Sequence, residues 1–242
     1  MGYSYSKVDT YAKCPYRYKL HYLDKVKTYK NLDPDNPLIC GTAMHMGVQE
    51  DLEKALAWYE SQFPALSDEH MNEELKIEAL VPKAKELVPE GSCFEVPLFD
   101  KGFQGFIDIL SDDWLLDIKY SNQSENYSKS EQIHVYRWYA EKLMKRRPRN
   151  IGYLMIPKVG LKQTRSETIH EYRRRLELEL EVTKPKIVSV NYSLSKVRSF
   201  FGKIREIQNA TDFPKKEGWL CKWCEYEGLC LEGSDLEIDF GE

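Results

Sequence analysis

The chain has 242 residues, of which 42% are hydrophobic and 31% charged, and its formal net charge is −4. These values fit one globular core with decorations and exclude a largely disordered chain. No apolar run approaches the roughly 20 residues of a membrane span, and the N-terminus lacks the features of a signal peptide. We therefore expect a cytoplasmic protein with no membrane partner. The net charge argues against indiscriminate coating of nucleic acid but allows a local basic groove.

Residues 4 to 23 predict a helical segment that Pro15 interrupts or restarts, with Ser4 or Ser6 as the cap. After a turn-rich stretch, residues 41 to about 62 have helical periodicity, with His45 in the first turns. A second, more polar helix follows to about residue 88. We therefore predict a helical N-terminal arm over residues 1 to 40, followed by further helices.

Three short apolar or alternating runs at 93–99, 103–110 and 114–121 are separated by turn residues and predict an antiparallel meander. Further elements are then predicted in chain order: a helix at 129–145, a strand at 151–157, a helix at 166–182, a strand at 186–192 and a helix at 193–209. The fold class is therefore α/β, a single domain with a mixed central sheet flanked by helices. We expect the core over residues 41–210 and a C-terminal segment with an acidic tail over 211–242.

Positive charge gathers between residues 142 and 175. A solvated helix face explains such a run about as often as contact with nucleic acid does, so both interpretations stay open. The basic side chains are Lys142, Lys145, Arg146, Arg147, Arg149, Lys158, Lys162, Arg165, Arg173, Arg174 and Arg175.

The most informative residues lie on two of the predicted strands. Asp108 ends one strand, and Asp117 and Lys119 share a face of the next because side chains alternate along a strand. If the two strands pair as a hairpin, Asp108 approaches Asp117 and forms a hard-oxygen site suited to Mg²⁺ or Mn²⁺. Such a cation can polarise a phosphoryl oxygen and activate water, and a lysine can stabilise the developing negative charge. By itself, Asp-x-Lys is more often a solvated strand face.

The order of four motifs resembles the RecB-like branch of the PD-(D/E)XK nuclease superfamily, which includes Cas4 proteins. They are a His after Gly41-Thr42, Gly-x-Ile-Asp at residues 105–108, Asp-x-Lys at 117–119 and Gln-x-x-x-Tyr at 132–136. The resemblance covers most of the chain and implies a restriction-endonuclease-like core. An Asp at the second acidic position, where the wider superfamily more often has Glu, fits this branch.

The same resemblance assigns roles by position. It implies that His45, Asp108, Asp117 and the carbonyl of Ile118 ligate the metal and that Lys119 is the catalytic lysine, with both aspartates counted as catalytic. Gln132 and Tyr136, at i and i+4 on one helix face, become substrate-positioning residues. Glu95, on the preceding strand, is either an outer-sphere partner or an exposed side chain.

Three of the six cysteines, Cys221, Cys224 and Cys230, lie within ten residues, and Cys14 is the obvious fourth ligand. In a cytoplasmic chain a disulphide framework is not expected, and four cysteines suit either zinc or a [4Fe-4S] cluster. The resemblance implies the iron-sulphur cluster, acting as a structural staple between the two ends of the chain. Cys40 and Cys93 are predicted to be buried apolar thiols.

We expect a metal-dependent exonuclease that acts on DNA ends or single strands. No P-loop occurs, so unwinding would need a partner such as a helicase. Recombination or repair, including in phages, and CRISPR adaptation are the two settings, with an integrase or a strand-annealing protein as possible partners. The length of the chain favours a stand-alone or phage-type exonuclease. The alternatives are a non-catalytic iron-sulphur module that binds DNA or supports assembly, and a zinc-ribbon protein with an accidental Asp-x-Lys.

Overall fold

A computed structural model describes residues 2–29 and 31–232. The acidic tail expected after Cys230 lies outside these residues, except for its first two. The chain divides into two compact units, and each is described by itself below. Unit 1 comprises Met1–Asn31, Phe99–Gly105 and Leu194–Glu242, and unit 2 comprises Leu32–Leu98 and Phe106–Ser193. The expected single domain with boundaries near residues 40 and 210 stays a prediction.

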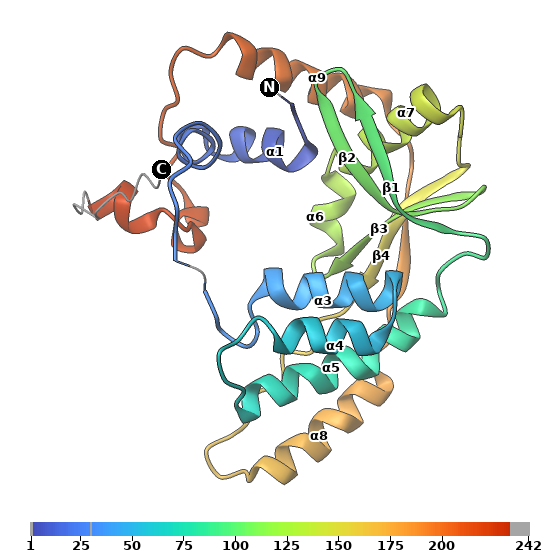
Figure 1. Ribbon diagram of the computed structural model, residues 1–242, viewed down its shortest axis with the longest axis vertical. Coiled ribbons are helices and arrows are strands. Elements are labelled where there is room, and N and C mark those ends of the chain that lie inside the picture. Colours follow the sequence, from blue (N-terminus) through green and yellow to red (C-terminus); the bar gives the residue numbers. More distant parts are fainter. Residues whose placement is uncertain (1, 30, 233–242) are drawn as a thin grey trace. The chain divides into compact units, whose positions relative to one another are not determined.

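A five-stranded sheet has the strand order β1-β2-β3-β4-β5 (Figure 1). β2 and β3 are antiparallel, β3 and β4 are parallel, and β4 and β5 are antiparallel, which confirms the predicted mixed sheet. The parallel pair needs a crossover, and α6 and α7 supply it. The strands are β1 (Cys93–Asp100), β2 (Phe103–Leu110), β3 (Trp114–Tyr120), β4 (Asn150–Ile156) and β5 (Lys186–Val190).

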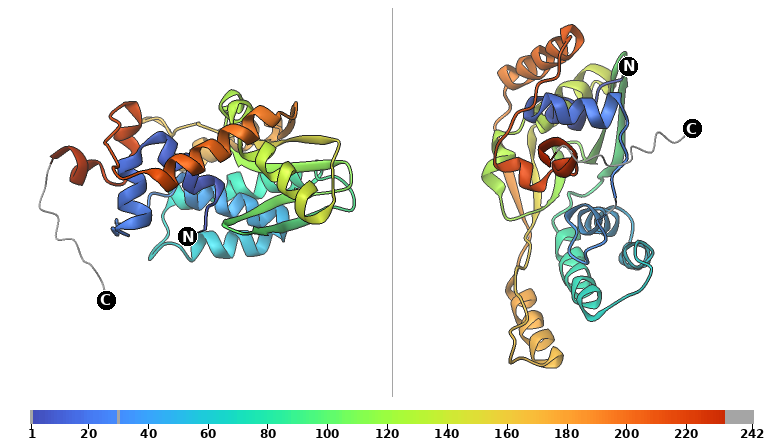
Figure 2. Two further views of the ribbon diagram at one scale, coloured as in Figure 1. Left: turned by 90° about the horizontal axis from the view of Figure 1, so that it is seen from above. Right: turned by 90° about the vertical axis from the view of Figure 1, so that its left-hand side faces the viewer.

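The main hydrophobic core lies between the sheet, the helices that precede it in the chain, and α8, which contributes Leu176 and Leu180. Ile109, Leu116 and Ile118 from the strands join Ala43 and Met44 from α3, all nearly or completely buried. Figure 2 shows α8 reaching beyond the strands that flank it in sequence. The helices of unit 2 are α3 (Pro37–Gln49), α4 (Leu52–Glu60), α5 (Asp68–Lys85), α6 (Ser124–Lys129), α7 (Gln132–Met144) and α8 (Ile169–Val182).

The single helix expected over residues 41–62 is wrong, because two helices occupy this stretch. α3 starts earlier, at Pro37, since the Asn36 side chain accepts hydrogen bonds from the first backbone N–H groups. It ends before Asp51, whose side chain caps α4 by accepting a bond from Lys54 N. His45 therefore lies in the middle of α3, between the cap at Asn36 and the end of the helix before Asp51.

Other predicted boundaries shift by a few residues. The expected helix at 129–145 corresponds to α7, and α6 is a separate short helix before it. The helix expected from residue 166 begins at Ile169, because Thr168 and Glu171 form a capping box. The polar helix expected to reach residue 88 ends at Lys85, and the strand expected to reach 192 ends at Val190. The order and type of these elements are as predicted.

Gly152 on β4 lies against the backbone of β5. A Cβ atom at this position would come 2.6 Å from the carbonyl oxygen of Val188, closer than real Cβ atoms approach. Because the neighbouring atom belongs to the backbone, the strands would have to move apart. We expect Gly152→Ala to lower the free energy of unfolding by about 2 kcal/mol, measured by urea denaturation. Gly160→Ala, where a Cβ would meet nothing within 4 Å, is the control, and equal effects would contradict this explanation.

Unit 1 joins the two ends of the chain. Arg17 pairs with both carboxylate oxygens of Glu225, Lys216 donates to the carbonyl of Ala12, and the Tyr226 hydroxyl donates to that of Val26. These contacts associate the N-terminal arm with the C-terminal segment. The elements are α1 (Tyr5–Lys13), α2 (Pro15–Tyr18), η1 (Lys19–Leu23), α9 (Leu194–Asn209), η2 (Trp219–Trp223) and η3 (Gly228–Glu232).

The helical arm is interrupted at Pro15, as predicted. Ser4 caps α1 by accepting a bond from Lys7 N, and Cys14 ends α1 and caps α2. Tyr18 is fully buried among aromatic rings, so it serves packing. Within the described part of the chain, no helix combines the length and the apolar character needed to cross a membrane.

Candidate metal centre

The two aspartates lie on neighbouring antiparallel strands. Ile109 of β2 pairs with Leu116 of β3 in an antiparallel register. Asp108 and Asp117 therefore form the next pair of residues opposite each other on these strands. The Asp108 carboxylate accepts a hydrogen bond of 2.7 Å from Ile118 N, which fixes its position. Both side chains are buried, Asp117 to 2% exposure. The hairpin on which the predicted site depends is therefore present. It holds two buried carboxylates next to each other on neighbouring strands.

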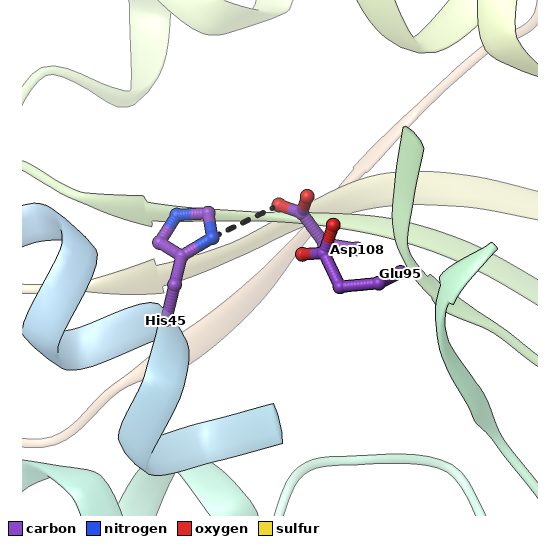
Figure 3. A group of neighbouring side chains, drawn as sticks. All are labelled: His45, Glu95 and Asp108. Carbon is purple, nitrogen blue, oxygen red and sulfur yellow. Dashed lines mark ion pairs between the residues drawn. The ribbon is translucent and has the colours of Figure 1, made fainter. Parts of the chain in front are cut away.

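His45 approaches these carboxylates from α3. Its Nδ1 atom lies 3.5 Å from an oxygen of Asp108 (Figure 3). The position of His45 follows from the packing of α3, because Ala43 and Met44 are fully buried in the core. Helix and sheet thus bring together residues that are more than 60 positions apart in the sequence.

Glu95 completes a group of three. One ligand atom each from His45, Glu95 and Asp108 lies within 4.8 Å of the others, a spacing at which they could hold a metal ion. Figure 3 shows the Glu95 carboxylate directed toward the same region as that of Asp108. The sequence left Glu95 between an outer-sphere role and simple exposure. Among the described residues, the group differs from the predicted ligand set by containing Glu95 and not Asp117.

The backbone at Glu95 is unusual for a strand. Its φ of 47° is in the left-handed region, which costs free energy for a residue with a side chain. Gln49 Nε2 donates a 2.6 Å hydrogen bond to Glu95 Oε1 and holds the carboxylate. Sequence reasoning did not single out Gln49, although it follows His45 by four residues and therefore shares its helix face.

Lys119 neutralises one of the two aspartates. Its Nζ atom lies 2.6 Å from Asp117 Oδ2, so this oxygen is already engaged by the ammonium group. The Tyr127 ring lies 5.5 Å from the same Nζ atom. On α7, Gln132 Nε2 donates to the Tyr136 hydroxyl at 3.5 Å, so these two residues face each other as their spacing predicts.

Burial and charge shift the pKa values of these groups. Burial and the charge of Asp117 raise the pKa of Asp108 well above its ordinary value, although Ile118 N–H opposes the shift. Burial lowers the pKa of His45, against the effect of Asp117. Burial would lower the pKa of Lys119, but its carboxylate neighbours outweigh that effect and raise it. Burial, followed by the charge of Asp117, raises the pKa of Tyr136, so the phenol lies within electrostatic reach of the aspartates.

A cleft of about 920 Å³ opens onto this centre. His45, Glu95, Ile118 and Lys119 line it, so four of the residues under discussion face solvent in one place. The volume is at the upper end of the range for ligand sites in proteins. An extended polymer in the cleft can therefore reach His45, Glu95 and Lys119 without any opening of the fold, whereas the buried Asp108 and Asp117 lie behind the lining.

The four predicted cluster cysteines meet in unit 1. Cys14, Cys221, Cys224 and Cys230 line one pocket together with apolar side chains that include Leu20. Of the other two, Cys40 is buried as predicted, but Cys93 is exposed at the start of β1, so its predicted burial is wrong. The alternating exposure of β1 explains this, because Cys93 is on its exposed face.

Several members of the basic run are used in ion pairs. Arg173 contacts Asp68 at 2.7 Å, and Arg175 contacts Glu167 at 2.7 Å. These two arginines bind α8 to neighbouring segments, which is a structural use. For Arg173 and Arg175, a role on the helix surface is therefore favoured over contact with nucleic acid.

Comparison with known proteins decides the family. Residues 3–231 match the model of the PD-(D/E)XK nuclease superfamily. The chain belongs to this superfamily. A similar solved structure is that of a protein from Eubacterium rectale described as "Putative exonuclease", with a TM-score of 0.61 and 12% identity, covering 93% of this chain and 87% of that one. No curated protein matches the sequence.

The family and the geometry agree on the core of this PD-(D/E)XK protein. Its mixed sheet carries the acidic residues and the lysine on neighbouring strands. Members of the superfamily are hydrolytic nucleases that use divalent metal ions, and DNA is the substrate that the family implies. The structural neighbour, at 12% identity, supports the fold.

Proposed function

We propose that this protein is a metal-dependent DNA exonuclease that hydrolyses phosphodiester bonds at DNA ends or in single strands. The observation that carries the proposal is the convergence of His45, Glu95 and Asp108 near the Asp117–Lys119 pair. His45, Glu95 and Lys119 also line an open cleft. Two carboxylates and an imidazole form a donor set that suits Mg²⁺ or Mn²⁺. Asp108 and Asp117 are both buried on neighbouring strands, and burying two like charges side by side costs free energy that a function at this site would explain.

Each residue has a proposed task. His45, Asp108, Asp117 and the carbonyl of Ile118 hold the metal, and we add Glu95 to this set on the basis of its position. The chemistry that a bound divalent cation supplies at such a site is polarisation of a phosphoryl oxygen and a lower pKa for the attacking water.

The neighbouring residues act on the substrate. Lys119 is the catalytic lysine, because its ammonium group is held beside Asp117 where negative charge would develop on the phosphate. Gln132 and Tyr136 position the substrate. Their mutual hydrogen bond keeps both side chains on the face of α7 that lies within electrostatic reach of Asp117.

We also propose that Cys14, Cys221, Cys224 and Cys230 bind a [4Fe-4S] cluster. Backbone N–H groups of Arg17 and Gly218 already donate to the sulphurs of Cys14 and Cys221, and such bonds stabilise thiolate ligands. A backbone hydrogen bond involving Tyr226 lowers the pKa of Cys224, although burial raises it overall. The pocket thus offers apolar walls and oriented donors.

Four cysteines suit either zinc or a [4Fe-4S] cluster, and the resemblance to RecB-like nucleases favours the cluster. The cluster would connect residues about 200 positions apart and stabilise unit 1.

Replacement of one cysteine tests the cluster. Cys14→Ser should lose the iron and the brown colour of anaerobically purified protein and lower the midpoint temperature of unfolding, because the site contributes folding free energy. Cys93→Ser is the matched control, since Cys93 is exposed and outside the pocket, and it should keep the iron. Metal analysis that gives one zinc and no iron per chain would replace the cluster by the zinc alternative.

We place the activity in recombination or repair, including in phages, or in CRISPR adaptation. An integrase, a helicase or a strand-annealing protein would then be the partner. Co-purification from the native cell distinguishes these settings. A stable complex with an integrase would support adaptation, and one with a strand-annealing protein would support recombination.

The proposed function is tested with end-labelled DNA. Anaerobically purified protein should release label from single- or double-stranded DNA with Mg²⁺ or Mn²⁺ and not with EDTA. Folded, cluster-loaded protein that leaves DNA intact under all these conditions but binds it would instead support the non-catalytic module.

A further inference from the structure

A second cavity of unit 2 adjoins the cleft of the metal centre. It has a volume of about 430 Å³, within the usual range for small-molecule sites. Tyr120 and Lys158 line both the cavity and the cleft, so the two spaces are neighbours. A strand lying in the cleft therefore comes within reach of Tyr120 and Lys158, which also line the cavity.

The cavity wall contains a buried ion pair. Glu73 and Lys76 lie on α5, three residues apart, and are 8% and 7% exposed. Lys76 Nζ donates to Glu73 Oε1. An ion pair removed from water usually contributes less stability than apolar residues of the same volume would. Folding alone thus gives no reason for two charges here, whereas a polar ligand in the cavity does.

The remaining wall is held in place by hydrogen bonds. The Tyr172 hydroxyl donates to the carbonyl of Leu161 at 3.0 Å. Asn122 bonds both the N–H and the carbonyl of Lys158 at 2.8 Å. The Lys158 ammonium lies 5.2 Å from the centre of the Tyr120 ring. These bonds fix the segment after β4 against the cavity, so the site is preformed.

The charges of the wall identify the chemistry of the ligand. Acidic and basic side chains are equal in number among the lining residues, which disfavours a simple anion such as phosphate. A carboxylate beside an ammonium suits a neutral group that has hydrogen-bond donors next to acceptors. Nucleobases have this property, and glutamate and lysine are among their usual partners. The charged lining residues are Asp35, Glu69, Glu73, Lys76, Lys158 and Lys162.

We propose that this cavity binds one unpaired nucleobase of the DNA strand in the cleft and that it favours guanine. Guanine fits best because its O6 acceptor can take a bond from Lys76 while its neighbouring N–H donors face Glu73. This inference rests on the proposed DNA substrate. It adds that the strand must present an unpaired base at one position near the scissile bond.

The experiment measures binding without cleavage. Thymidine oligonucleotides that carry one guanine, moved along the strand, are bound to the protein in EDTA and followed by fluorescence anisotropy. At one position the guanine should tighten binding about tenfold relative to the all-thymidine strand. Glu73→Gln should abolish this preference. Glu78→Gln, an exposed residue of the same helix, should keep it.

A second variant guards against loss of fold. Glu73→Met combined with Lys76→Met replaces the ion pair by apolar residues of similar volume, which is often neutral for stability. It should melt like the wild type and show no guanine preference. A wild type with no preferred position, or a double variant that keeps the preference, would overturn the inference. If the protein shows the guanine preference but never cleaves DNA, the nuclease proposal is refuted and the base-binding inference is kept.

Discussion

Lys119→Met should reduce DNA cleavage about 10³-fold at saturating Mg²⁺ while the protein still binds DNA. The ammonium group of Lys119 lies 2.6 Å from Asp117 Oδ2 and lines the cleft, so it is fixed where charge develops on the phosphate. Methionine matches the lysine side chain as far as Cε and removes the charged ammonium group. Initial rates on end-labelled DNA measure the effect.

The same change has an effect on stability. It leaves Asp117, only 2% exposed, without its ammonium partner, and breaking a buried pair in this way costs about 3 kcal/mol. Urea denaturation in EDTA should show this loss. Lys129→Met at the exposed end of α6 is the control and should match the wild type in both assays. Full cleavage by Lys119→Met would remove Lys119 from the mechanism.

Asp108→Asn should abolish metal-dependent cleavage and yet stabilise the protein in EDTA by roughly 1 kcal/mol. Asparagine can still accept the hydrogen bond from Ile118 N that fixes this side chain. It removes one of two buried carboxylates that face each other across β2 and β3, and hence their repulsion. Residues that serve catalysis often lower stability in this way.

Two measurements separate these effects. Cleavage assays should show a loss of about 10³-fold or more, the effect of losing a transition-state contact. Thermal unfolding in EDTA should show a midpoint at or above that of the wild type. Asp112→Asn in the exposed β2–β3 turn should change neither quantity. A variant that is less stable in EDTA would mean that the Asp108 charge supports the fold.

The backbone strain at Glu95, like the repulsion between Asp108 and Asp117, lowers stability at the candidate metal centre. Its positive φ and its hydrogen bond from Gln49 direct the Glu95 carboxylate toward two other polar side chains, His45 and Asp108. Backbone strain of this kind persists where the surrounding structure imposes it, and it is common at functional sites. The centre thus combines charge repulsion and strain, and the hydrophobic core between α3, α5 and the sheet offsets both.

The sequence by itself determined the fold class, the order of the elements apart from the division into α3 and α4 and the short helix α6, and the residues of the aspartate hairpin. Side-chain alternation on a strand is local, so the spacing of Asp117 and Lys119 is enough to place both on one face. The turn between residues 110 and 114 is short, so it also brings Asp108 opposite Asp117. The break at Pro15 is equally local, because proline cannot continue a helix hydrogen-bond ladder.

Only the tertiary structure decided which other groups join the centre. His45 reaches Asp108 because the start of α3 and the packing of its buried face set the rotation of the helix. Glu95 joins through a backbone conformation that alternation cannot reveal. Cys93 is exposed because of its place on β1, although its residue type predicts burial. Distances between segments far apart in sequence depend on packing, and local patterns carry no information about them.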